Sequence, residues 1–148
     1  MTGVIETYPV LAMIALGWTL PDPGGRPAGR LPKYNPEVKA TYSPSNWQHV
    51  CGSVKREFSQ RGLLGTAQWL EDLRQKAEPR KSDQDGLDAC ICLLVALHLA
   101  EGKECLMVGN MQTGHIVVAH DAELEMELKD RCRKTGRDPA AWVRTFRW

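Results

Sequence analysis

The sequence predicts an α/β fold, and three segments of the 148-residue chain lead to this prediction. Residues 3–8 form a short β-branched and aromatic stretch that runs directly into a helix-forming stretch. Residues 85–101 are an apolar helical segment that opens with aspartates. Residues 104–119 alternate around a Gly- and Asn-containing turn, as in a β-hairpin. Hydrophobic residues make up 43% and charged residues 25% of the chain, so residues 1–148 are expected to form a single globular domain.

The first segment, "GVIETY", is interpreted as a strand over residues 3–8. Pro9 ends that strand and suits the first turn of a helix, which is predicted over residues 10–16 and stops at Gly17. Glu6 therefore lies near the carboxyl end of a strand that feeds a helix. Ligands commonly bind at such strand ends in open α/β sheets.

Residues 19–45 are predicted to form a long loop, because they are rich in Pro, Gly and basic residues and show no periodicity. Basic residues interleaved with tyrosines suit a phosphate backbone and stacked bases. The alternative is a solvated surface loop without a ligand. The residues expected to contact nucleic acid are Arg26, Arg30, Lys33, Tyr34 and Lys39.

Helical spacing and stop signals define the remaining elements. A helix capped by Ser45 or Asn46 is expected to end at Gly62, and a second is expected over residues 66–77. A polar connector over residues 78–84, which includes Asp83, leads into a buried helix over 85–101. The predicted hairpin pairs residues 104–108 with 115–119 and precedes helices over 121–134 and 138–148.

The acids at the start of the buried helix are the candidates for chemistry. Asp85 and Asp88 are three residues apart and share one helix face. Helix capping explains Asp85. Asp88 precedes an apolar stretch, where an unpaired carboxylate is costly to bury, although both acids can also be solvated at an exposed helix end. If the fold brings Glu6 beside them, three carboxylates form a site suited to Mg²⁺ or Mn²⁺ and to phosphodiester hydrolysis.

Composition excludes some classes of protein. The formal net charge is +1, so no overall field draws the chain to nucleic acid or membrane. The cysteine count is odd, no CxxC occurs and no secretory signal is visible, which indicates a reduced, cytoplasmic protein. The apolar run 89–100 is shorter than the roughly 20 residues that span a bilayer. No membrane contact is therefore expected.

Two stretches, "VIETYPVLAMIALG" at 4–17 and "DGLDACICLLVALHLAEGKECLMVGNMQTGHIVV" at 85–118, resemble the C-terminal half of the domain-of-unknown-function family 429. Members of this family are regarded as predicted nucleases of the RNase H-like fold. The resemblance implies a partial RNase H-like architecture: a short strand–helix unit, a helical middle, a long buried helix, and a C-terminal hairpin and helices. It also implies that Glu6, Asp85 and Asp88 are catalytic ligands of two divalent cations.

The chain departs from the family pattern at its start. The family begins with a strand that carries an aspartate, and here the chain begins two residues before Val4. The resemblance therefore implies a truncated nuclease that is inactive alone. Three explanations stay open: a mis-set start or broken gene, a partner protein chain that supplies the first strands, or a relative that no longer cuts. The alternative function is a non-catalytic module that binds protein or nucleic acid.

Overall fold

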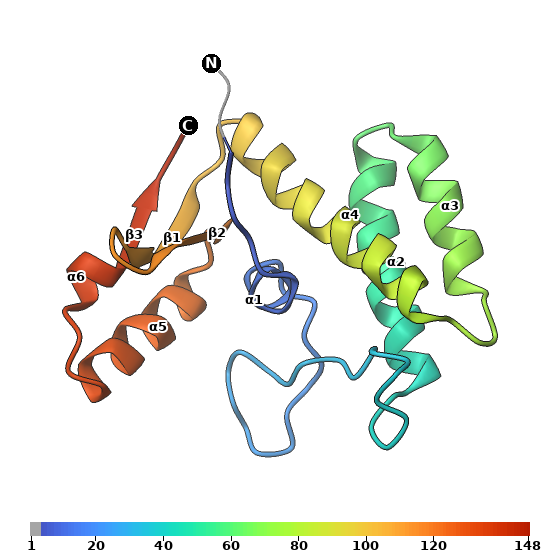
Figure 1. Cartoon of the computed structure of the whole chain (residues 1–148), viewed down its shortest axis with the longest axis horizontal. Coiled ribbons are helices and arrows are strands. Elements are labelled where there is room, and N and C mark those ends of the chain that lie inside the picture. The colour runs from blue at the N-terminus through green and yellow to red at the C-terminus, as the bar shows by residue number, and fades with distance from the viewer. Residues whose placement is uncertain (1–3) are drawn as a thin grey trace.

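The computed structural model describes residues 4–148, which form an α/β arrangement of six helices and one three-stranded antiparallel sheet (Figure 1). The sheet and its neighbouring helices lie at one end of the molecule, and a pair of helices lies at the other. The elements in chain order are α1 (Pro9–Ala15), α2 (Pro44–Gln60), α3 (Leu64–Arg74), α4 (Lys81–Ala100), β1 (Cys105–Asn110), β2 (Gly114–Ala119), α5 (Ala122–Lys134), α6 (Pro139–Trp142) and β3 (Val143–Phe146).

Helix α4 connects the two ends of the molecule (Figure 1). It contacts α2 on one side and both α1 and β2 on the other. Its inward face is apolar and includes Leu87, Ile91 and Leu99, whereas Leu93 on another face is 48% exposed. The expected buried helix is therefore buried along one face only, because helical periodicity turns part of the apolar run toward solvent.

The predicted hairpin is confirmed and is slightly longer than expected. Strands β1 and β2 pair antiparallel, with Val108 opposite Ile116, and β1 also pairs with β3 in the order β2-β1-β3. The Asn110 side chain accepts hydrogen bonds from the backbone N–H groups of Gln112 and Thr113, at 3.0 and 2.8 Å. These bonds shape the turn, as asparagine commonly does.

The predicted first strand is an extended segment. Gly3 lies outside the described residues, and residues 4–8 are not assigned as a strand. The Glu6 backbone carbonyl nevertheless accepts a hydrogen bond from the Val117 N–H at 2.8 Å, so this segment lies beside β2. The helix predicted after it is confirmed as α1.

Several predicted boundaries were wrong for local reasons. Helix α2 is capped by Ser43, not by Ser45 or Asn46, because Pro44 fits the first helical turn and the Ser43 hydroxyl accepts from the Asn46 N–H. Helix α3 runs over residues 64–74, two residues earlier than expected at its start. The C-terminal helix lasts one turn, after which residues 143–146 pair with β1 as an edge strand.

The start of α4 was also misplaced. The helix begins at Lys81, so residues 81–84 are helix rather than connector, and Asp85 is not the cap. The N-cap residue is Arg80, and Asp83 at the third helical position completes a capping box, because its Oδ2 accepts a hydrogen bond from the Arg80 N–H at 2.7 Å and its Oδ1 lies 2.8 Å from Lys76 Nζ. Among the described helices, none is long and apolar enough to cross a membrane.

Replacing Asp83 with alanine should lower the free energy of unfolding by about 1 kcal/mol at pH 7, as loss of a cap does. The Lys76 ammonium holds the pKa of Asp83 below its ordinary value. The stabilisation is therefore complete above the unfolded pKa and is lost as the pH falls through the folded pKa. Urea unfolding of wild type and Asp83→Ala at neutral and acid pH measures both effects. A variant that is equally destabilised at acid pH would contradict this account.

Candidate functional site

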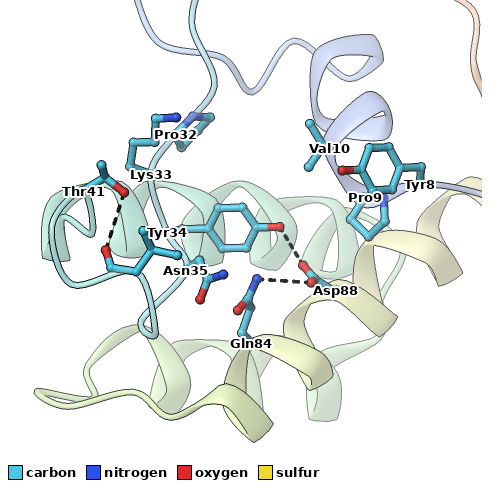
Figure 2. Close-up of a pocket in the computed structure, with 11 residues that line it drawn as sticks. Tyr8, Pro9, Val10, Pro32, Lys33, Tyr34, Asn35, Thr41, Gln84 and Asp88 are labelled. Atoms are coloured by element: carbon cyan, nitrogen blue, oxygen red, sulfur yellow. Dashed lines mark hydrogen bonds between the residues drawn. The ribbon is translucent and has the colours of Figure 1, made fainter.

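A pocket of about 390 Å³ opens where the loop before α2 passes the first turns of α4 (Figure 2). Its volume lies in the range of small-ligand sites. Three parts of the chain supply its walls: the segment that enters α1, loop residues 32–41, and one face of α4. We call it the Asp88 pocket, and it is lined by Tyr8, Pro9, Val10, Pro32, Lys33, Tyr34, Asn35, Val38, Thr41, Gln84 and Asp88.

The Asp88 carboxylate is the only acidic group in the lining of this pocket. The Tyr34 hydroxyl donates a hydrogen bond of 2.7 Å to Asp88 Oδ1, and the Gln84 amide lies at a long 3.5 Å from Oδ2 (Figure 2). Burial raises the pKa of Asp88, while the Tyr34 hydrogen bond acts against that rise. Burial, together with the neighbouring carboxylate, raises the pKa of Tyr34, so the phenol stays protonated and donates.

Replacing Tyr34 with phenylalanine should lower the free energy of unfolding by about 1.5–3 kcal/mol, the range for a hydrogen bond to a charged group. The reason is that Asp88 keeps its half-buried charge and loses its best donor. The same substitution should be less costly in an Asp88→Asn background, where the acceptor is neutral. A double-mutant cycle by urea unfolding measures this coupling. Equal costs in both backgrounds would show that the bond contributes nothing specific.

The other two predicted acids do not join Asp88 in this pocket. Asp85 is one turn away, with 63% of its side chain exposed, and its Oδ1 lies 2.6 Å from Lys81 Nζ. Glu6 is exposed on the extended segment beside β2. Within residues 4–148, no group of three or more His, Cys, Asp or Glu side chains is placed to hold a metal ion.

These placements test whether the chain suits Mg²⁺ or Mn²⁺. Such cations need several oxygen ligands around one point. Here one carboxylate is held by neutral donors, a second is paired with a lysine, and the third lies on a different element. The described residues alone therefore do not fit a divalent cation.

The long basic loop is closed by a short antiparallel bridge. Leu20 and Arg30 exchange backbone hydrogen bonds of 2.9 and 2.8 Å, so residues 20–30 form a loop with a fixed base. Gly29 sits beside this bridge with φ of +73°, and a Cβ there would lie 2.6 Å from the Leu20 carbonyl oxygen. Only glycine fits such a position without a shift of the backbone.

A second pocket, of about 500 Å³, lies where this loop meets α1 and α5. We call it the basic pocket, because four cations and one carboxylate line it: Arg26, Arg30, Lys33, Arg131 and Glu127. Arg26 pairs with Asp22 at 3.4 Å and Arg131 pairs with Glu127. Arg30 and Lys33 make no ion pair among the described residues. Lys33 and Val10 line both pockets, which are therefore neighbours.

The residues that were predicted to contact nucleic acid lie in different places in the structure. Arg26, Arg30 and Lys33 line the basic pocket, and Lys39 is exposed outside it. Tyr34 lines the Asp88 pocket, where the residue is 6% exposed and its hydroxyl binds Asp88, and its contact with nucleic acid stays a prediction. Sequence reasoning missed Arg131, which was assigned only to a helix over residues 121–134, and missed Gln84, which was assigned to a connector.

No protein-family model, curated protein or solved structure matches the chain. The resemblance to the domain-of-unknown-function family 429 therefore stays a prediction.

Proposed function

We propose that the protein binds nucleic acid, with the basic pocket holding the phosphate backbone. The observation that carries this proposal is the convergence of four cationic side chains, from a bridged loop and from α5, on one hollow. Phosphate contacts of Arg and Lys supply most of the sequence-independent affinity of nucleic-acid-binding proteins. Because the net charge is only +1, attraction of a polyanion depends on local clusters of cations such as this one.

The charge balance of the pocket supports a polyanionic ligand. Arg30 and Lys33 carry charges that no carboxylate of the described residues neutralises, and Arg30 is held by its hydrogen bond of 3.2 Å to the Pro21 carbonyl. Val10, Ile14 and Leu31 add apolar surface to the lining of the same pocket. A sugar–phosphate chain presents the same mixture of charged and apolar surface.

Fluorescence anisotropy of labelled single-stranded RNA, single-stranded DNA and duplex DNA tests the proposal. We expect saturable binding of at least one single strand at low salt, with weakening as salt is added. Absence of binding to all three probes at low salt would overturn the proposal.

The second candidate is metal-dependent cleavage of phosphodiesters by an RNase H-like site completed from outside this chain. The observation that favours it is the position of Asp88 and Asp85 on adjacent turns of α4, at and beside a pocket that adjoins the basic pocket. Glu6 is the third acid of this candidate. Because residues 4–148 do not gather enough oxygen ligands, this candidate requires further acids from outside the described residues.

Cleavage of single- and double-stranded DNA and RNA with Mg²⁺ or Mn²⁺ tests this candidate, with a chelator as the metal-free control. Asp88→Asn should abolish cutting, whereas Asp72→Asn, which removes the same charge from the exposed surface of α3, should not. Absence of metal-dependent cutting, or equal cutting by both variants, rules out the activity for this chain.

A further inference from the structure

We propose that the Asp88 pocket recognises the base of an unpaired guanine nucleotide whose phosphate lies in the basic pocket. This inference rests on the proposed function and adds the identity of the base. Three observations support it: Asp88 has unfilled acceptor sites, the charges around that carboxylate disfavour some ligands, and two residues line both pockets.

The first step is the count of acceptor sites on Asp88. An ionised carboxylate offers about four lone-pair sites, two on each oxygen. Tyr34 fills one site on Oδ1 at 2.7 Å, and Gln84 approaches one on Oδ2 at 3.5 Å. About one site on each oxygen is left, so a ligand with two parallel N–H donors suits it best. The Watson–Crick edge of guanine, with its ring N–H and its amino group, has that arrangement.

The second step uses charge to choose among ligands with paired donors. An arginine side chain has the same donor geometry but carries a positive charge. Lys33 lines the pocket, and Lys81 is close enough for its charge to lower the pKa of Asp88. Lys81 is already paired with Asp85 at 2.6 Å, so Lys33 is the lining cation that disfavours a positively charged ligand and favours a neutral base attached to a phosphate. On their Watson–Crick edges, adenine and cytosine each place an amino donor beside a ring-nitrogen acceptor, and thymine places one ring N–H between two carbonyl acceptors. None of the three offers two adjacent donors to a carboxylate.

The third step is the continuity of the two pockets. Lys33 and Val10 line both, so a phosphate beside Lys33 can be joined to a base beside Asp88.

The amide groups of Asn35 and Gln84 also line the Asp88 pocket and can donate to the guanine O6 acceptor. The Tyr8 ring lines the pocket and is 53% exposed, which leaves it available to stack on a base (Figure 2).

Two sets of probes test the inference and separate a free nucleotide from a strand. In the first set, GMP, IMP and AMP are titrated against the whole protein by tryptophan fluorescence; IMP lacks only the guanine amino group. In the second set, a short oligothymidine is compared with the same strand carrying one central guanine. We expect GMP to bind about tenfold more tightly than IMP or AMP, and the guanine-containing strand to bind about tenfold more tightly than oligothymidine.

Asp88→Asn should abolish both preferences, because an amide offers one acceptor and one donor in place of two acceptors. Asp72→Asn, which removes an exposed charge from α3, should preserve them. Equal binding of GMP, IMP and AMP together with equal binding of the two strands overturns the inference. A preference that survives in Asp88→Asn, or tighter binding of an arginine amide than of GMP, also overturns it. Failure of every strand to bind would instead overturn the proposed function.

Discussion

The double variant Arg30→Gln/Lys33→Gln should bind a single-stranded oligonucleotide roughly 25-fold more weakly than wild type at about 0.1 M salt. This value assumes that each lost cation removes one phosphate contact, and that each contact contributes about 0.7 to the salt exponent for single strands. The two side chains are chosen because they line the basic pocket and have no carboxylate partner among the described residues. Fluorescence anisotropy at several salt concentrations measures the effect.

The matched control is Lys76→Gln/Lys103→Gln. It removes the same charge from the connector before α4 and from the turn after it, where each lysine already pairs with a carboxylate. This control should change affinity little at the same salt concentration. If the two double variants weaken binding equally, net charge explains the affinity and the basic pocket does not.

Gly29→Ala should weaken oligonucleotide binding by about 5- to 25-fold although it changes no charge, the range for one to two lost phosphate contacts. The added Cβ would lie 2.6 Å from the Leu20 carbonyl oxygen and 2.7 Å from Thr19 Oγ1. Relief of that clash requires the bridge between Leu20 and Arg30 to open. Arg26 and Arg30 then lose their fixed positions in the basic pocket, and binding has to order the loop.

Gly25→Ala is the control for backbone strain in the same loop. Gly25 has the same φ of +73°, but a Cβ there meets no atom within 4 Å. Both substitutions therefore destabilise the folded state by about 1–2 kcal/mol, because alanine disfavours the left-handed backbone conformation. Only Gly29→Ala adds a backbone clash. Circular dichroism and urea unfolding establish that each variant is folded. If Gly25→Ala reduces affinity as strongly as Gly29→Ala, the bridge does not organise the binding site.

Much of the fold could be predicted from local patterns. The hairpin, α1 and α5 carry their signals within a few residues: alternation around Asn110 and Gly114, Pro9 at a helix start, and Asp121 as an N-cap. The start of α4 was misplaced because Asp85 directly precedes the apolar run and fits an N-cap, so the polar residues 81–84 were assigned to the connector. The contacts of Asp83 with Arg80 and Lys76, which mark the true start, depend on the folded structure.

The candidate site was less predictable because it depends on contacts between distant residues. The hydrogen bond from Tyr34 to Asp88 spans 54 positions and has no local signature. The interleaving of tyrosines with basic residues suggested an exposed loop, but the Tyr34 ring is buried against the Asp88 pocket. Asp88, the acid that helix capping could not explain, is the one with a tertiary partner. The cations of the loop were recognisable, whereas the contribution of Arg131 required the packing of the loop against α5.

The salt dependence of oligonucleotide binding tests the central claim most directly. With two unpaired and two carboxylate-paired cations around the basic pocket, the slope of log K against log salt should lie between about −1.4 and −2.8 for wild type and should become shallower by about 1.4 in Arg30→Gln/Lys33→Gln. A wild-type slope near zero, or one that is unchanged in the double variant, would contradict a phosphate backbone held in the basic pocket.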